Sequence, residues 1–362
     1  MAMDMNNKTE NNIKEQLLIK IAQDPKNEDN YLELARLYVI EQNYEEALGT
    51  YEALLKINSF NSQALINAGS LYFFFRDINK SIDYYTRATE LESDSFSVYM
   101  NLGNAYAELN EFDKAMKNYT KALELEGNSA ALYNAIGLLY QDNKDYLSAI
   151  VNYDRAIAVE PDCPDNYINK ASSQMSMHMY REAIKTLKKA LSYDKNSLKA
   201  LICTANCFAA IKDFDNAEKY FEKCYKLDED VYQVYVCHAI AYSDANRIDM
   251  AISKYKEAIS IEPNLPNAYI LLGNIYNDQN KYLEALDCYK KAVEINPGDA
   301  KTYTFIGNTY FMLNDLENAI YTYRTALSHN ALSLENKLVY IEILQEYIRR
   351  KEENTGEKIG AS

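Results

Sequence analysis

Residues 96–129, FSVYMNLGNAYAELNEFDKAMKNYTKALELEGNS, contain two helical patterns with a break between them. The first apolar stripe comprises Tyr99, Leu102, Gly103 and Tyr106. After the polar pair Asn110-Glu111, the second stripe comprises Phe112, Ala115, Tyr119 and Ala122. Spacings of three and four residues place each set on one face of a helix. The stretch is therefore predicted to form helix A, a short turn and helix B.

This pattern recurs along the chain with a period of 34 residues. One series of glycines is Gly69, Gly103, Gly137, Gly273 and Gly307, and one of tyrosines is Tyr38, Tyr72, Tyr106, Tyr140, Tyr242, Tyr276 and Tyr310. Two alanine series follow the same period. Repeats therefore start at residues 28, 62, 96, 130, 164, 198, 232, 266 and 300, and the last ends at Ser333. The sequence predicts an all-α chain of nine helix–turn–helix repeats in residues 28–333.

Each recurring residue has a steric role. Gly or Ala at position 8 lets helices A and B approach closely, and Ala at positions 20 and 27 does the same for helix B. Tyr at position 11 and Tyr or Phe at position 24 fill the space that these small residues leave. This signature resembles the tetratricopeptide-repeat (TPR) family, and the array is similar to the repeat domain of O-linked N-acetylglucosamine transferases and to bacterial TPR proteins. The resemblance implies an α-solenoid that winds as a right-handed superhelix.

The two ends should differ from the repeats because terminal units must shield an apolar face. We expect residues 1–9 to be disordered and residues 10–27 to form an N-terminal capping helix. At the other end, residues 334–350 form an amphipathic pattern like helix A, with Ile341 where Gly or Ala belongs. They are predicted to be the C-terminal capping helix, and residues 351–362 are predicted to be a disordered tail.

Charge and composition narrow the class of partner. The net charge is −15, which opposes binding to nucleic acid or to an anionic membrane. The N-terminal sequence has no apolar core of a signal peptide, and no stretch is long and apolar enough to span a membrane. The six dispersed cysteines fit reduced thiols. We therefore expect a cytoplasmic protein.

No catalytic motif is found, which predicts that the chain is not an enzyme and needs no cofactor. The sequence lacks HExxH, GxxxxGK[ST], GxGxxG and GxSxG. Cys203 and Cys207 are four residues apart, with Cys237 and His238 one repeat later, and such a set could hold zinc. Small buried cysteines are the commoner explanation, so no metal is expected.

Partner recognition is expected on helix A. In the TPR family, positions 2, 5, 6, 9, 12 and 13 of this helix line the concave surface. Here these positions include ten asparagines: Asn67, Asn101, Asn104, Asn134, Asn169, Asn206, Asn267, Asn274, Asn277 and Asn308. Such a row can hydrogen-bond the backbone of an extended peptide, because each amide both donates and accepts. Alternatively, Asn at position 9 only follows the consensus of the family.

Apolar residues share this surface and indicate an interface, unless curvature of the solenoid buries some of them. They are Phe73, Phe74, Met100, Ile168, Met175, Ile202, Val236, Ile240, Ile270 and Phe311. The predicted groove residues are Phe73, Phe74, Met100, Asn101, Asn104, Asn134, Asn169, Asn206, Ile240, Asn274, Asn308 and Phe311. No three consecutive repeats carry the Lys, Asn and Arg pattern of a carboxylate clamp for chaperone C-termini.

Repeats 5 to 7 depart from the signature. Position 7 holds Lys170, Thr204 and His238, and repeat 5 has Gln174 at position 11 and Leu187 at position 24. These substitutions are either ordinary sequence drift that neighbouring residues tolerate, or they indicate a flexible joint or a special polar site.

The sequence as a whole predicts a non-catalytic scaffold that binds a protein or peptide partner in its groove. Two alternatives remain open: a substrate-docking or regulatory arm of a separate enzyme, or a bacterial effector or secretion-linked adaptor.

Overall fold

A computed structural model of the chain describes residues 2–91, 94–227, 231–329 and 334–355. Within these residues the chain forms twenty α-helices and no β-strand. It divides into two compact units, Met1–Met179 and Tyr180–Ser362, which are described separately below. The boundary falls inside repeat 5, the repeat with Gln174 at position 11 and Leu187 at position 24.

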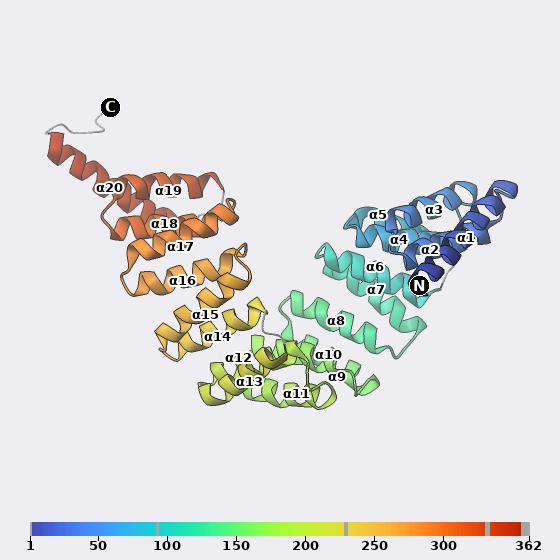
Figure 1. The fold of residues 1–362 in the computed structure, drawn as a ribbon, viewed down its shortest axis with the longest axis horizontal. Coiled ribbons are helices and arrows are strands. Elements are labelled where there is room, and N and C mark those ends of the chain that lie inside the picture. The colour runs from blue at the N-terminus through green and yellow to red at the C-terminus, as the bar shows by residue number, and fades with distance from the viewer. Residues whose placement is uncertain (1, 92–93, 228–230, 330–333, 356–362) are drawn as a thin grey trace. The chain divides into compact units, whose positions relative to one another are not determined.

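Unit 1 contains ten helices (Figure 1): α1 (Ala2–Gln23), α2 (Glu28–Ile40), α3 (Tyr44–Ile57), α4 (Ser62–Phe74), α5 (Ile78–Glu90), α6 (Phe96–Glu108), α7 (Phe112–Leu125), α8 (Ala130–Asp142), α9 (Tyr146–Val159) and α10 (Pro164–Ser176). Unit 2 contains the other ten: α11 (Tyr180–Tyr193), α12 (Leu198–Ala210), α13 (Phe214–Leu227), α14 (Tyr232–Asp244), α15 (Ile248–Ile261), α16 (Pro266–Asp278), α17 (Tyr282–Ile295), α18 (Ala300–Met312), α19 (Leu316–Ser328) and α20 (Leu334–Thr355).

The predicted repeat register is confirmed. The even-numbered helices α2 to α18 are the nine A helices, and each begins at the residue where its repeat was predicted to start. The odd-numbered helices α3 to α19 are the B helices. Within each unit, every helix packs against the next one in chain order. This arrangement confirms the all-α, helix–turn–helix solenoid; the sense of the superhelix stays a prediction.

Glycine at position 8 and tyrosine at position 24 fit together in five repeats. A Cβ atom added to Gly103 would lie 2.4 Å from the ring of Tyr119, and one added to Gly273 would lie 2.6 Å from the ring of Tyr289. Equivalent contacts of 2.6–2.8 Å join Gly69 to Tyr85, Gly137 to Tyr153 and Gly307 to Tyr323. Since real Cβ contacts are longer than this, each glycine is required by the aromatic ring that lies against it.

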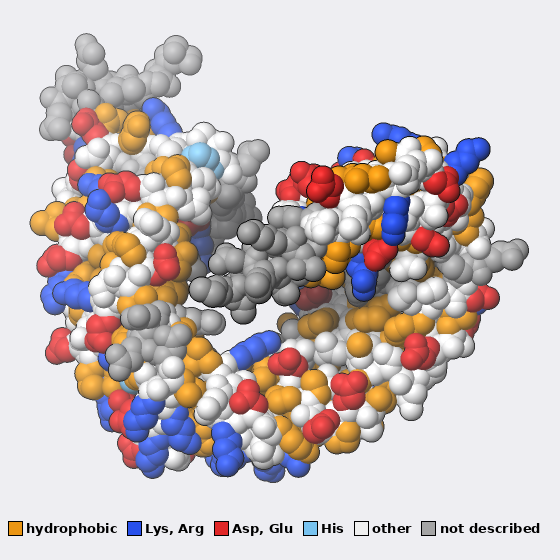
Figure 2. Space-filling view, turned by 45° about the vertical axis from the view of Figure 1, so that its right-hand side comes forward, with side chains coloured by type: hydrophobic (Ala, Val, Ile, Leu, Met, Phe, Trp, Pro, Cys, Tyr) orange, Lys and Arg blue, Asp and Glu red, His pale blue; other side chains and the backbone are white. Residues whose placement is uncertain are grey.

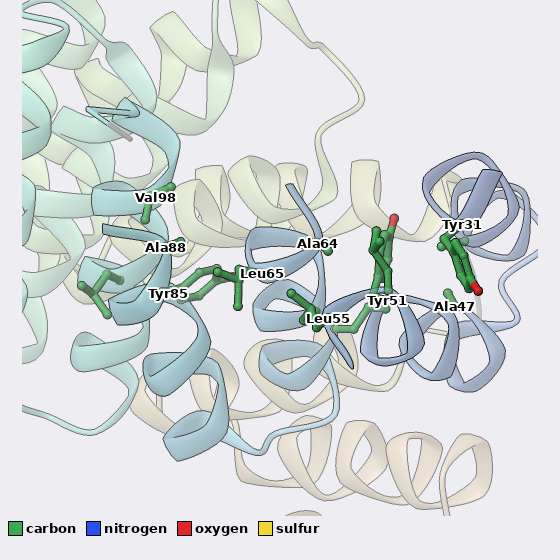
Figure 3. Close-up of a cluster of buried hydrophobic side chains, with 14 residues drawn as sticks. Tyr31, Ala47, Tyr51, Leu55, Ala64, Leu65, Tyr85, Ala88 and Val98 are labelled. Carbon is green, nitrogen blue, oxygen red and sulfur yellow. The ribbon is translucent and has the colours of Figure 1, made fainter. Parts of the chain in front are cut away.

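The tyrosines at position 24 are part of the core between neighbouring helices. In unit 1, Tyr51 and Tyr85 lie among small and branched side chains from successive helices, as Figure 3 shows. Ala47 and Ala88 are fully buried there. The alanines at positions 20 and 27 therefore act as expected, by letting bulky rings reach the space between helices.

Every turn between helices A and B uses the same backbone conformation. Position 15 has a positive φ of 58–65° in all nine repeats, although none of these residues is glycine. In repeat 3, Asn110 N–H donates to the Ala107 carbonyl and Glu111 N–H donates to the Tyr106 carbonyl. This is the Schellman pattern, which satisfies the last carbonyl groups of a helix. The turn is thus defined by its hydrogen bonds rather than by glycine.

The helix bounds at both ends differ from the predicted ones. Helix α1 begins at Ala2, inside the stretch 1–9 that was expected to be disordered, and α20 continues to Thr355, past the expected end at residue 350. The sequence has no Pro or Gly in 2–23 or in 334–355, so nothing stops the helix earlier. Leu17 and Ile343 are buried against the repeats, consistent with capping roles. The expected disorder of 356–362 lies outside the described residues.

Replacing Gly103 with Ala is expected to destabilise the protein by about 1–3 kcal/mol, because the new methyl group overpacks the contact with Tyr119. The matched control is Gly49→Ala. Gly49 lies in helix α3 with nothing within 4 Å of its missing Cβ, so Ala should stabilise by about 0.5–1 kcal/mol. Thermal melting followed by circular dichroism measures both changes. Equal melting temperatures for the two variants would contradict the proposed steric fit.

Candidate functional site

Three of the four asparagines at position 9 contact the tyrosine at position 24 of the same repeat. The Tyr119 hydroxyl donates to Asn104 Oδ1 at 2.7 Å, and the Tyr289 hydroxyl donates to Asn274 Oδ1 at 2.8 Å. Tyr323 and Asn308 make the same bond. The Oδ1 atom of each of these asparagines therefore accepts a hydrogen bond from a buried tyrosine. This bond orients the Nδ2 group of the asparagine away from the tyrosine ring. No described residue accepts a hydrogen bond from these three Nδ2 groups, so each remains a donor for a ligand.

The other predicted asparagines have different partners. Asn169 Nδ2 donates to Asn134 Oδ1 at 2.9 Å, so these two residues contact each other across neighbouring repeats. In repeat 6, position 24 is Phe221, which has no hydroxyl, and Asn206 Nδ2 instead contacts Cys237 Sγ at 3.7 Å. Asn101 is half-buried and makes no hydrogen bond with another described side chain. The predicted asparagines thus differ from repeat to repeat in their hydrogen-bond partners.

Unit 1 has a hollow of about 460 Å³ on its A helices α4, α6 and α8. It is lined by Phe73, Asn104, Ala107, Glu108, Asn110, Tyr119, Ala135, Leu138, Leu139 and Asp142. Two predicted groove residues, Phe73 and Asn104, lie together here. The lining includes two carboxylates and no basic side chain; Glu108 forms an ion pair of 3.2 Å with Arg76.

Unit 2 has a larger hollow of about 610 Å³ on helices α14, α16 and α18. Its apolar lining includes Val236, Ile270, Leu271 and Phe305. Its polar lining includes Gln233, Asn267, Asn274, Asp299, Lys301 and Thr302, so one acid and one base are present. An apolar floor with a few convergent polar groups is typical of a binding site.

Sequence reasoning found only part of this second hollow. Asn274 was among the predicted site residues, and Val236, Ile270 and Asn267 were in the wider set. Cys237, Leu271 and Phe305 were missed, although all three occupy position 6, one of the positions expected to face a ligand. The register of the repeat could therefore have identified them.

Several other predicted residues do not line either hollow. Phe74 is exposed, with its ring 4.7 Å from Tyr44 and 5.6 Å from Phe75. Ile240 and Phe311 are also exposed, while Met100 and Asn134 are half-buried. Of the wider apolar set, Ile168 and Ile202 are buried in the core, at 1% and 6% exposure, so their assignment to an open groove was wrong.

A buried polar cluster surrounds His238 in unit 2. Its imidazole is stacked between Phe221 and Tyr242, with ring centroids 4.4 Å and 4.2 Å away. Nδ1 lies 2.8 Å from the Tyr225 hydroxyl and Nε2 lies 3.3 Å from Glu218 Oε2. A neutral ring satisfies both contacts, by accepting from the tyrosine and donating to the carboxylate. Burial lowers the pKa of His238, although Glu218 opposes this shift.

The remaining unusual residues at position 7 have local partners. Lys170 forms an ion pair with Asp154 at 2.6 Å, and the Thr204 hydroxyl donates to the Ala200 carbonyl at 2.7 Å. Among the three, only His238 therefore belongs to an extended polar cluster.

Burial disfavours the thiolate form of the cysteines of repeats 6 and 7. Burial raises the pKa of the Cys207 thiol to about 12 and that of Cys224 to about 11, and it also raises the pKa of Cys203 and Cys237. Zinc binds thiolates, so this environment opposes the metal-binding alternative. The described residues contain no group of three or more metal-ligating side chains. That the chain binds no metal nevertheless stays a prediction.

The folds of the two units and the position of their hollows on the A helices define an α-solenoid of helix–turn–helix repeats. Models described as tetratricopeptide repeat match residues 62–95, 96–129, 266–299 and 300–330, and a TPR repeat model matches 241–277. The chain belongs to the tetratricopeptide-repeat family. A further model, described as anaphase-promoting complex, cyclosome, subunit 3, matches residues 142–224.

Solved structures agree with this fold. Yeast Tom70 is similar with a TM-score of 0.59 and 14% identity, over 97% of this chain and 96% of that chain. A tetratricopeptide repeat protein from Parabacteroides merdae also has a TM-score of 0.59, with 17% identity over 68% of this chain and 98% of that chain. No curated protein sequence matches the chain. In the described part of the chain, no helix has the length and apolar character needed to cross a membrane.

The His238 cluster should make stability depend on pH. Because the pKa of the folded imidazole lies below the unfolded value of about 6.5, the unfolded chain binds the proton more readily. The contribution of the neutral His238 to the free energy of unfolding is therefore present at pH values above the unfolded pKa. It is lost as the pH falls below that pKa. Restoring the usual apolar residue with His238→Leu should reduce the loss of stability on acidification, as measured by urea unfolding.

The control for this test is His329→Asn, because the His329 side chain is exposed. If both variants lose stability with falling pH as steeply as the parent protein, the His238 cluster does not contribute. The charged groups that act on His238 are Glu218, Lys254 and Glu257.

Proposed function

We propose that the chain is a non-catalytic interaction scaffold whose A helices bind a peptide or helix of a partner protein. Family membership supports this role, because stacked repeats form extended binding surfaces. The observation that carries the proposal is the hollow of unit 2, which combines an apolar floor with an unpaired amide donor. Among the described residues, this hollow brings together the apolar side chains and the hydrogen-bond donor that a bound peptide needs.

A bound peptide must recover the hydrogen bonds that its backbone loses on leaving water. Asn274 is suited to this task, because Tyr289 holds its oxygen and leaves Nδ2 available. Apolar side chains of the peptide would contact Val236, Ile270 and Phe305 in the same hollow. Since Asp299 and Lys301 balance each other in charge, binding here should depend only modestly on salt.

The other predicted groove residues extend this proposal to unit 1. Phe73 and Asn104 line its hollow, where Asp142 favours a partner segment that carries a basic side chain. We expect no substrate turnover by the purified protein at either hollow.

The proposal is tested with peptides selected from a random library against the full chain. Ile270→Ser should weaken the binding of a selected peptide about tenfold or more, since it removes an apolar contact worth roughly 1.5–3 kcal/mol when buried. The matched control is Leu283→Ser on helix B α17, where the side chain is 67% exposed. Isothermal titration calorimetry measures both. If peptides bind Ile270→Ser unchanged but lose affinity for Leu283→Ser, the hollow is not the binding site.

Asn274→Asp removes the Nδ2 donor proposed to bind the peptide but keeps an oxygen that can accept from the Tyr289 hydroxyl. The aspartate still accepts from the Tyr289 hydroxyl, so the melting temperature should stay close to that of the parent, but the Nδ2 donor is lost. Affinity for a selected peptide should therefore fall while stability is retained. Unchanged affinity would mean that the amide does not hydrogen-bond the peptide.

A further inference from the structure

The segment of unit 2 that carries α11 to α13 differs in charge from the chain as a whole. Residues 180–227 contain ten basic and six acidic side chains, a net charge of +4, whereas the whole chain has a net charge of −15. Figure 2 shows Lys and Arg side chains gathered at the bottom of the molecule, at the height where Figure 1 places α11 and α13. A local excess of this sign in an acidic protein is a candidate docking surface.

These charges surround a hollow of about 480 Å³ that is formed mainly by helices α11 and α13. We call it the basic hollow. It is lined by Lys188, Leu191, Ser192, Lys195, Asn196, Leu201, Tyr220, Lys223, Lys226 and Leu227. Among the described residues, which exclude 228–230, no carboxylate is part of this lining. Because both helices are B helices, the basic hollow is distinct from the A-helix hollow of the same unit.

The four lysines of the basic hollow are exposed. None of them forms an ion pair with a carboxylate of the described residues, which exclude 228–230. Lysines elsewhere in the chain do form such pairs, for example Lys114 with Glu111 and Lys291 with Glu294. Lys223 Nζ lies 4.5 Å above the Tyr220 ring and Lys188 Nζ lies 5.7 Å from the centre of the Phe208 ring. Such contacts hold an ammonium group in place without cancelling its charge.

The floor of the hollow is apolar. Leu201 is buried at its base, Leu191 is half-buried, and Leu227 is exposed at its edge. A ligand that uses the whole hollow must therefore place an apolar group on the leucines and several negative charges near the rim. A phosphate backbone offers charge alone, and the acidic surface of the remaining chain repels a long polyanion.

We propose that the basic hollow binds an acidic segment of a partner protein, in which glutamate or aspartate residues flank a leucine-like side chain. The carboxylates contact Lys188, Lys195, Lys223 and Lys226, and the apolar side chain packs on Leu191 and Leu201. The chain then has a second docking site, on its B helices, that works independently of the A-helix hollows.

The test uses the full chain and a fluorescein-labelled synthetic peptide in which glutamates flank one leucine, with binding measured by fluorescence anisotropy. The site variant is Lys188→Gln/Lys195→Gln/Lys223→Gln/Lys226→Gln. The control variant is Lys80→Gln/Lys114→Gln/Lys121→Gln/Lys291→Gln, which changes the net charge equally and removes lysines that are exposed and ion-paired. All eight side chains lie at the surface, and circular dichroism checks that both variants fold.

The site variant should lose about tenfold or more in affinity, because four lysine–carboxylate pairs are removed together. The control variant should stay within about twofold of the parent, and binding to the parent should weaken from low to physiological salt. Equal losses in the two variants, or no binding by the parent, would overturn the proposal.

Two further probes test the chemical class of the ligand. Replacing the leucine of the peptide by alanine should weaken binding to the parent; unchanged affinity would exclude a role for the apolar floor. A single-stranded oligothymidine of the same net charge should compete poorly with the peptide. If it binds more tightly than the peptide and depends on the same four lysines, the surface is a nucleic-acid site and the assignment to an acidic protein segment is wrong.

Discussion

The contact between glycine at position 8 and tyrosine at position 24 is the constraint on which the packing of five of the nine repeats depends. The ring lies where a Cβ of helix A would be, with separations of only 2.4–2.8 Å to that missing atom. This fit sets how closely helices A and B approach. It also carries the hydroxyl through the core to the A-helix surface, where it meets position 9. A packing residue thereby sets the orientation of a potential ligand donor, as with Tyr289 and Asn274.

Repeats that lack the hydrogen bond between the tyrosine at position 24 and an asparagine at position 9 present a different surface. Repeat 4 has Leu138 at position 9, so the Tyr153 hydroxyl donates to Gln141 Oε1 at 3.3 Å. Repeat 6 has Phe221 at position 24, and the freed amide of Asn206 turns to Cys237. Each A helix consequently presents different polar groups, although the backbone repeats with one period. Such variation lets a regular solenoid distinguish between partners, because its A helices have the same backbone shape but carry different hydrogen-bond donors and acceptors.

Charge is also distributed unevenly within the repeats. The unit 1 hollow contains Glu108 and Asp142, the unit 2 hollow on the A helices balances Asp299 with Lys301, and the basic hollow on the B helices has four lysines. The net charge of −15 therefore does not predict the charge of any one of these surfaces. In a solenoid, each surface is made by neighbouring repeats only, so local sequence sets local charge.

The sequence by itself determined the period, the nine repeat starts and the need for small residues at positions 8, 20 and 27. These follow from the spacing of small and apolar residues within each 34-residue repeat, because that spacing places them on the helix faces that pack together. The tertiary structure decided which A-helix residues line a hollow, since Val236, Ile270 and Phe305 come together from three helices. It also decided that Ile168 and Ile202 are buried, that Asn104 bonds Tyr119, and that lysines of α11 and α13 share one hollow. Periodicity assigns a residue to a face, but only the neighbouring helices determine what that face contacts.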